Sequence, residues 1–183
     1  KNLELKTALN TFNEAEKYCE KSDYIKGRSY IKSGISDIYL NLGDFNNALK
    51  ASYESLEIDL RIGNKYGEII SYNKLGNIYI LLKQFSKAKE FLFKARDEAH
   101  ATGHLDQLMV AYNYLTQIAV NDNDFRLAYN YAIESKAIRD SIYSHKDLNK
   151  IADLQTAFFV ERKNRENELL KKDIQLEKNN RNF

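Results

Sequence analysis

The sequence has no proline and only seven glycines, so the residues that most often interrupt a helix are scarce. Cys19 is the single cysteine, which excludes a disulfide within the chain. No run of about 18 apolar residues occurs, and we therefore expect no membrane span inside the chain. Together these absences favour a helical domain that is held together by packing alone.

The chain also lacks a large excess of either positive or negative charge. The 183 residues include 28 Lys and Arg against 26 Asp and Glu, which leaves a net charge of +2. Proteins that bind nucleic acids usually carry a basic surface. We therefore expect no nucleic acid among the partners of this region.

Groups that carry out catalysis are scarce as well. His100 and His104 are four residues apart, but Gly103 lies between them at an expected helix end, which argues against a metal-binding pair. The sequence contains no glycine-rich phosphate loop, no metal-type cysteine spacing and no nucleophile elbow. We expect no catalytic residues, no cofactor and no metal site in this region.

The sequence does contain a repeat with a period of 40 residues. Small, aromatic and aliphatic residues recur in it as Ala48, Ala88 and Ala128; Phe45, Phe85 and Phe125; Ile35, Leu75 and Leu115; Ser55, Ala95 and Ser135; and Gly63 and Gly103. Tyr72 and Tyr112 also match, although the first copy has Lys32 at that position. Each unit shows the apolar spacing of two amphipathic helices. We therefore expect paired helices that stack along one continuous apolar seam.

The repeat predicts the positions of the helices and the domain organisation. Helices are expected at roughly 24–42, 44–62, 65–82, 84–101, 105–121 and 124–142. The expected divisions are residues 1–22, the second helix of a truncated upstream repeat; 23–62, 63–102 and 103–144, three repeats; and 145–183, a capping helix and charged stalk. Because the first helix of the upstream unit is missing, we expect the chain to be a fragment of a longer protein.

The segment from Leu75 to Ala95 resembles the tetratricopeptide repeat. The matching residues are Tyr72, Leu75, Gly76, Tyr79, Phe85, Ala88 and Ala95. The resemblance implies an all-α, right-handed superhelix of helical hairpins that binds a protein or a peptide. The period of 40 exceeds the usual 34 of the family, so we expect longer helices.

The stretch from Ile138 to Lys178 resembles a junction in sensor proteins of Bacteroidetes-type bacteria, where such repeats lead through a long helix to a membrane span and an output module. The likeness lies in Arg139-Asp140-Ser141, in 152–156 and in the charged residues that follow. It implies the sensor region of a histidine kinase or a transcriptional regulator, on the periplasmic side, with a membrane span just downstream. The alternative is a free-standing cytoplasmic scaffold or adaptor.

The C-terminal residues leave two interpretations open. Ile151, Leu154, Phe158 and Phe159 can form the apolar face of a capping helix, because the last repeat of a stack would otherwise expose its core. Residues 161–168 are polar all round, as in a solvated helix. The first interpretation is a capping helix with a frayed end, and the second is a stalk that forms a homodimer.

A row of polar residues on the first helices suggests a binding groove. Spacing by four places them on one face of each helix. The candidate peptide-binding residues are Asp37, Asn41, Asn73, Asn77, Asn113, Gln117 and Asn121. Tyr30, Leu40, Ile70, Ile80, Val110 and Val120 are expected beside them. Carboxamides both donate and accept hydrogen bonds, so this row suits the main chain of an extended peptide.

Overall fold

The computed structural model describes residues 2–144, 160–161 and 163. The helices of this part of the chain are α1 (Asn2–Lys21), α2 (Ile25–Leu42), α3 (Phe45–Ile62), α4 (Lys65–Leu81), α5 (Phe85–Thr102) and α6 (Leu105–Asn121), followed by a helix at 125–144. No strand occurs among the described residues. These bounds agree with the predicted helices to within two residues, and the predicted all-helical fold is confirmed.

The chain divides into two compact units, residues 1–139 and 140–183. In the second unit, the described residues 140–144, 160–161 and 163 are helical. The rest of the predicted capping helix and stalk, and with it the predicted dimer contact, lies outside the described residues.

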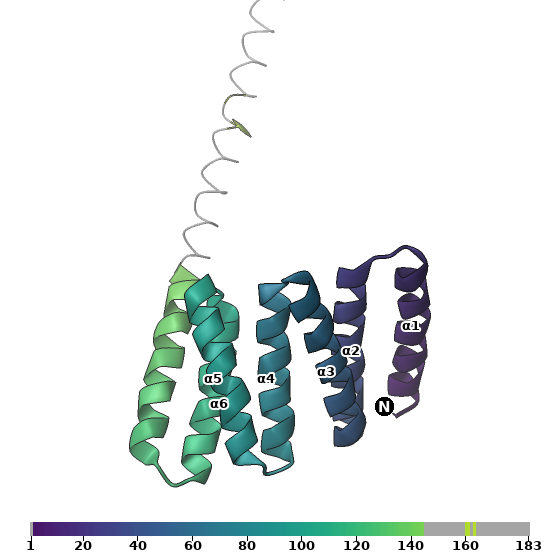
Figure 1. Cartoon of the computed structure of the whole chain (residues 1–183). Helices are drawn as coiled ribbons and strands as arrows, with labels where there is room; N and C mark the ends of the chain where they lie inside the picture. Colours follow the sequence, from purple (N-terminus) through teal and green to yellow (C-terminus); the bar gives the residue numbers. More distant parts are fainter. Residues whose placement is uncertain (1, 145–159, 162, 164–183) are drawn as a thin grey trace, which may run out of the picture. The chain divides into compact units, whose positions relative to one another are not determined.

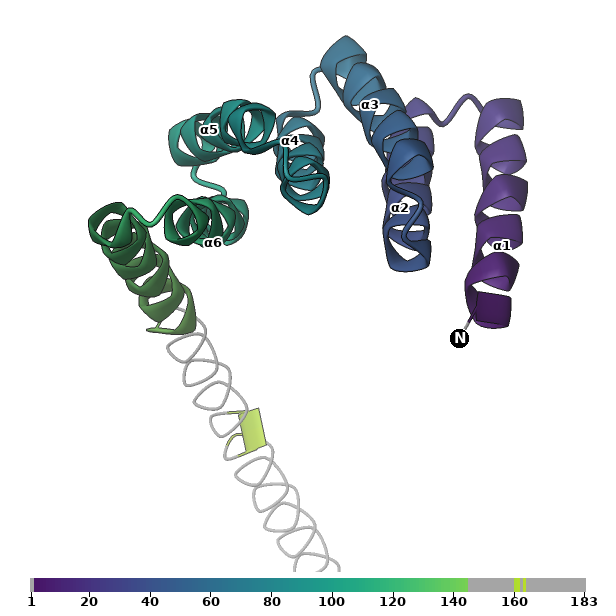
Figure 2. The same ribbon diagram turned by 90° about the horizontal axis from the view of Figure 1, so that it is seen from below.

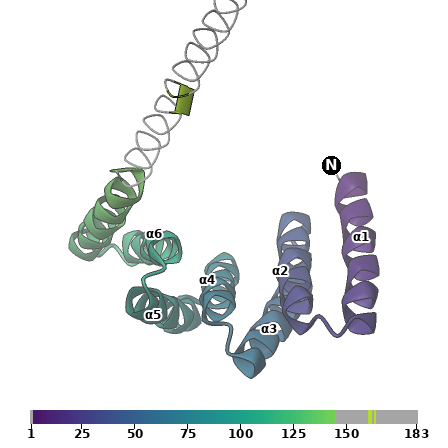
Figure 3. The ribbon, with the colours of Figure 1, turned by 90° about the horizontal axis from the view of Figure 1, so that it is seen from above.

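The first unit is a stack of antiparallel hairpins. Consecutive helices lie side by side in chain order and alternate in direction (Figure 1). Seen along the helices, they follow an arc (Figures 2 and 3), in which α2, α4 and α6 line the inner side and α3 and α5 the outer side. The first helix of each hairpin therefore lines the concave face, as expected for stacked hairpins.

Left-handed residues end the helices at the turns. Gly63 and Gly103 have φ angles of 66° and 74° and close α3 and α5, as their repeat positions predicted. Asp44 caps α3, because its Oδ1 accepts a hydrogen bond from the Asn47 backbone N–H at 3.1 Å. Asp124 does the same for the next helix with the Leu127 N–H at 3.0 Å.

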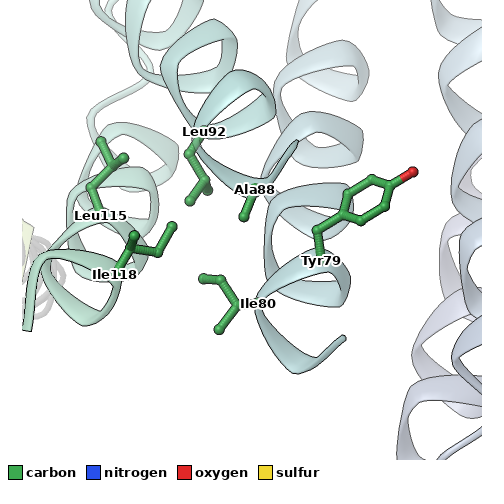
Figure 4. Packing of buried hydrophobic residues seen from close by; sticks show 6 residues of the cluster. All are labelled: Tyr79, Ile80, Ala88, Leu92, Leu115 and Ile118. Carbon is green, nitrogen blue, oxygen red and sulfur yellow. The ribbon is translucent and has the colours of Figure 1, made fainter. Parts of the chain in front are cut away.

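Many of the residues that recur every 40 positions form the core, although the recurring phenylalanines do not, since Phe45 and Phe85 are only partly buried and Phe125 is 65% exposed. Ala48, Ala88 and Ala128 are buried, as are Ile35, Leu75 and Leu115. One cluster joins α4, α5 and α6 through Tyr79, Ile80, Ala88, Leu92, Leu115 and Ile118 (Figure 4). Recurrence in the sequence therefore corresponds to recurrence in packing.

Buried polar side chains interrupt the predicted apolar seam within the first repeat and at its contact with the second. The buried polar residues are Ser29, Ser36, Ser52, Ser55, Asp59 and Ser71, and buried apolar residues such as Leu56, Ile58 and Ile69 lie on the same helices. They lie between the apolar cluster of α1–α3 and the clusters of α4–α6. Leu49 and the ring of Tyr53, whose centroid is 6.0 Å from that of Phe91, still connect α3 to the second of these. Ser36 and Ser52 hydrogen-bond at 2.7 Å between α2 and α3 within the first repeat, and Ser71 of α4 donates to Ser55 of α3 at 3.3 Å across the junction.

Asp59 is the most deeply buried charged residue of this junction, with 1% of its surface exposed. Its carboxylate accepts hydrogen bonds from the Ser29 hydroxyl at 2.6 Å and the Asn64 amide at 2.7 Å. Burial raises the pKa of Asp59 from its ordinary 3.8, and these two donors only partly oppose the effect. The nearby Glu68 carboxylate raises this pKa further, while Lys26 lowers it.

Lys32 departs from the repeat because it replaces packing with ion pairs. Its ammonium bridges Glu16 of α1 at 2.8 Å and Glu54 of α3 at 2.9 Å. Burial lowers the pKa of Lys32, but the two carboxylates outweigh burial and raise it. The equivalent Tyr72 instead lies against Phe91, with ring centroids 6.3 Å apart.

The raised pKa of Asp59 predicts how stability depends on pH. The folded state favours the neutral acid, so this residue stabilises the fold below pH 3.8 and loses that contribution as the pH rises through the folded pKa. The asparagine of Asp59→Asn does not ionise in this pH range, so its contribution to the free energy of unfolding does not change with pH. Urea unfolding from pH 4 to 7 should therefore show the variant gaining stability relative to wild type as the pH rises, whereas parallel curves would contradict this account.

Candidate peptide groove

The predicted polar row lies on α2, α4 and α6, which line the concave side (Figure 3). Its seven members do not share one environment. Three are bound or buried by contacts with other helices, two bond locally on their own helix, and two present unengaged amides.

On α2, both predicted residues are exposed. Asp37 forms an ion pair with Lys74 of α4, and 55% of the Asp37 side chain remains accessible. Asn41 donates from Nδ2 to the Asp37 backbone carbonyl at 2.8 Å. Asp37 therefore offers a carboxylate to a ligand, while the amide of Asn41 is already engaged.

Asn73 differs from the expectation of an exposed groove residue, because only 3% of its surface is exposed. Its Nδ2 donates to the backbone carbonyl of Gln107 at 3.0 Å and to the Gln107 Oε1 at 3.2 Å. The contact joins α4 to α6. Asn73 thus connects neighbouring repeats and does not face a ligand.

On α6, Asn113 is exposed but accepts a hydrogen bond from the buried hydroxyl of Ser135 at 2.6 Å. Asn121 is exposed and bonds to the neighbouring Asp122. The amides of Asn77 and Gln117 make no hydrogen bond within the described residues. Asp37, Asn77 and Gln117, which are 40 residues apart, are therefore the groove row that remains open to a ligand.

Two residues outside the predicted set shape this row. Lys74 spans from α4 to α2, where it bonds to Asp37 and donates to the Ser33 carbonyl at 2.8 Å. Burial lowers the pKa of Lys74, against the opposing effect of Asp37. Burial, together with the charge of Asp37, raises the pKa of Tyr114 on α6. Lys74 and Tyr114 occupy the same position of the repeat, where the first copy has Gly34. This shared position was the feature of the sequence that could have identified them.

Apolar side chains flank the row. Tyr30 on α2, Leu81 on α4 and Val120 on α6 are each 44–48% exposed. Ile80 was expected among them but belongs to the core, with 7% of its surface exposed, because it packs towards Leu92 and Ile118. The concave face therefore combines two free amides and one carboxylate with exposed apolar side chains.

The described residues contain neither a metal-type cluster nor a membrane-type helix. Among the described residues, no three His, Cys, Asp or Glu side chains come close enough to hold a metal ion. None of the described helices is long and apolar enough to cross a membrane. The polar groups on the concave face are amides and a carboxylate, which can donate and accept hydrogen bonds.

Comparison with known proteins agrees with this fold. Residues 28–97 match the family model described as the tetratricopeptide repeat. Residues 28–97 form a tetratricopeptide-repeat region. Tetratricopeptide repeats are non-catalytic modules that bind proteins, so this region is a scaffold for protein–protein interaction.

Two relatives place this tetratricopeptide-repeat region in context. Outer dynein arm-docking complex subunit 4 of Xenopus laevis is 24% identical over 144 residues, which cover 79% of this chain and 26% of the relative. The chain thus spans about a quarter of that protein. The crystal structure of BtubC (BKLC) from P. vanneervenii has a TM-score of 0.67 at 20% identity, over 76% of this chain and 58% of that one. This likeness shows the fold alone.

The contacts of the predicted polar row lead us to expect two classes of alanine variant. Asn113→Ala should lower the free energy of unfolding by about 1–3 kcal/mol, because it leaves the buried Ser135 hydroxyl without its acceptor. Asn77→Ala and Gln117→Ala should each change it by less than about 0.5 kcal/mol. Urea unfolding measures the difference, and similar losses in all three variants would show that the open row is structural.

Proposed function

We propose that the concave face binds an extended peptide segment of a partner protein through Asp37, Asn77 and Gln117. The observation that supports this most directly is that the amides of Asn77 and Gln117 are unengaged on successive first helices. One side-chain amide can both donate a hydrogen bond to a peptide unit and accept one from it. Because α4 and α6 each present such an amide, the contact can extend along the main chain of a bound peptide. Tyr30, Leu81 and Val120 provide apolar contact beside it.

The charges on this face favour a ligand without strong net charge near its centre. Asp37 is already paired with Lys74, so the two charges largely cancel. A carboxylate-rich ligand would have to displace Asp37 from Lys74, and a cationic one would compete with Lys74 for Asp37. We therefore expect hydrogen bonds to the ligand main chain to contribute more than ion pairs.

The binding test compares two double variants. A phage-displayed library of random peptides should yield binders on the wild-type protein, and Asn77→Ala with Gln117→Ala should reduce their binding at least tenfold because each lost amide leaves peptide polar groups unpaired. Asn46→Ala with Asn130→Ala, which changes two exposed residues of the second helices, is the matched control. Equal binding by both double variants would place the ligand elsewhere.

The biological setting has two candidates. The resemblance of Ile138–Lys178 to sensor proteins supports a sensor region that couples peptide binding to an output module in a bacterial signalling protein. The curated relative is named as a docking-complex subunit, which supports a scaffold or adaptor. The reading frame beyond Phe183 separates them: a membrane span followed by a kinase or DNA-binding module supports the sensor, and an immediate stop codon supports the scaffold.

A further inference from the structure

The second repeat contains an aromatic slot between its flanking second helices, and Tyr79 fills it. Tyr79 is 7% exposed, and its ring stacks on Phe91 with centroids 5.6 Å apart and planes 5° apart. Its hydroxyl lies 2.9 Å from the hydroxyl of Tyr53. In Figure 4 the ring points away from the other five labelled side chains. Tyr79 thus connects α4 to both α3 and α5.

One period later the same slot lacks its ring. Ala119 stands 40 residues after Tyr79, while Phe93 and Tyr131 stand in place of Tyr53 and Phe91. The ring pair beside it is kept, because Tyr112 and Tyr131 have centroids 5.8 Å apart, close to the 6.3 Å between their equivalents Tyr72 and Phe91. The smaller side chain leaves space beside Phe93 and Tyr131.

A pocket occupies the position of the missing ring, and we name it the Ala119 slot. It has a volume of about 270 Å³ and is lined by Lys89, Phe93, Leu115, Ala119, Asp122, Asp124, Leu127 and Tyr131. Five of these eight side chains are apolar. The volume lies just below the roughly 300–1,000 Å³ of pockets for drug-sized ligands, so the slot suits one inserted side chain.

The rim of the slot is charged where the second repeat is apolar. Lys89 and Asp122 form an ion pair at 2.7 Å, and they stand 40 residues after Leu49 and Leu82. Both side chains are more than a third exposed. An apolar pocket with a polar, solvent-exposed rim is the usual surroundings of an anchoring side chain at a protein interface.

The Ala119 slot is separate from the peptide groove. Two residues along a helix rotate a side chain by about 200°, so Ala119 and the groove residue Gln117 lie on opposite faces of α6. The slot is bounded by α5 and the helix at 125–144, which are second helices. A ligand there does not compete directly with one on the concave row.

We propose that the Ala119 slot binds a phenylalanine side chain of a partner protein. The occupant follows from the second repeat, where the equivalent space holds a flat aromatic ring. Phenylalanine fits better than tyrosine because Phe93 lacks the hydroxyl with which Tyr53 pairs Tyr79. A buried phenol without a partner would lose free energy.

The first repeat offers a weaker match. There Tyr39 is present, but Ala51 replaces the Phe91 ring. The resulting pocket is lined mostly by polar side chains, among them Asn13, Lys32, Asn47 and Glu54. Desolvating these groups would oppose the insertion of an apolar ring, so the Ala119 slot is the one that suits phenylalanine.

The binding test uses N-acetylphenylalaninamide as the probe and NMR of the methyl groups as the readout. The methyl resonances of Ala119 and Leu127 should shift in wild type with a dissociation constant on the order of 1 mM. Ala119→Phe fills the slot with its own ring and should abolish binding. Ala101→Phe adds the same ring at an exposed position of α5 and should leave binding unchanged.

The groove double variant Asn77→Ala with Gln117→Ala should bind this probe as wild type does, so failure of the slot and failure of the groove are distinguishable. N-acetyltyrosinamide should bind more weakly than the phenylalanine probe. Unshifted methyl resonances in wild type, or equal shifts in Ala119→Phe, would overturn the proposal.

Thermal unfolding tests the shape of the slot without any ligand. Ala119→Phe should raise Tm by several degrees because it buries a ring in space that is already formed. Ala119→Tyr should raise it less, and adding Phe93→Tyr should recover the difference by restoring the paired hydroxyls of the second repeat. A fall in Tm for Ala119→Phe, as overpacking produces, would contradict a ring-shaped slot.

Sedimentation distinguishes a foreign partner from a second copy of the chain. Phe125 is 65% exposed and is the alternative occupant from another copy. A wild-type protein that remains monomeric supports the foreign partner. A dimer that Ala119→Phe dissociates would overturn it and assign the slot to self-association.

Discussion

The structure depends on close approach between helices at small residues placed once in every 40. Ala48, Ala88 and Ala95 are almost fully buried, and each lets a neighbouring helix pack against its backbone. What recurs from repeat to repeat is the room for a close helix crossing, more than the identity of the residue. A Cβ on Gly76 would lie 2.5 Å from the Cγ of Leu92, whereas the first repeat uses Ser36 and Ser52, joined by a hydrogen bond, at the same crossing.

The helices and their stacking could be predicted from the sequence, because both follow from periodicity within one chain segment. The environment of the polar row could not. Periodicity shows which side of a helix a residue occupies, but not what a neighbouring helix places against it. Asn73 meets Gln107 and Asn113 meets Ser135, and both contacts depend on how adjacent helices are rotated. Asn77 and Gln117 have the same spacing in the sequence, yet their amides remain open.

The two halves of the concave face are joined by different forces. Between α2 and α4 the inner contact is Lys74 with Asp37 and the Ser33 carbonyl, and behind it lies the polar junction around Asp59. The α4–α6 side rests on apolar clusters. Polar contacts exchange with water and with ligands at smaller net cost than a packed core. A ligand that engages Asp37 therefore acts on the junction that is least supported by apolar packing.

Departures from the repeat are informative according to whether the structure compensates for them. Lys32 lacks the ring packing of a tyrosine but forms ion pairs with Glu16 and Glu54. Asp59 is buried away from water, but its carboxylate accepts hydrogen bonds from Ser29 and Asn64. Each of these exchanges is satisfied inside the fold, so neither requires a partner. Ala119 removes a ring, and within the described residues no side chain enters the space that remains. An uncompensated loss in an otherwise regular stack leaves preformed apolar surface, which is the condition under which binding gains most from burial.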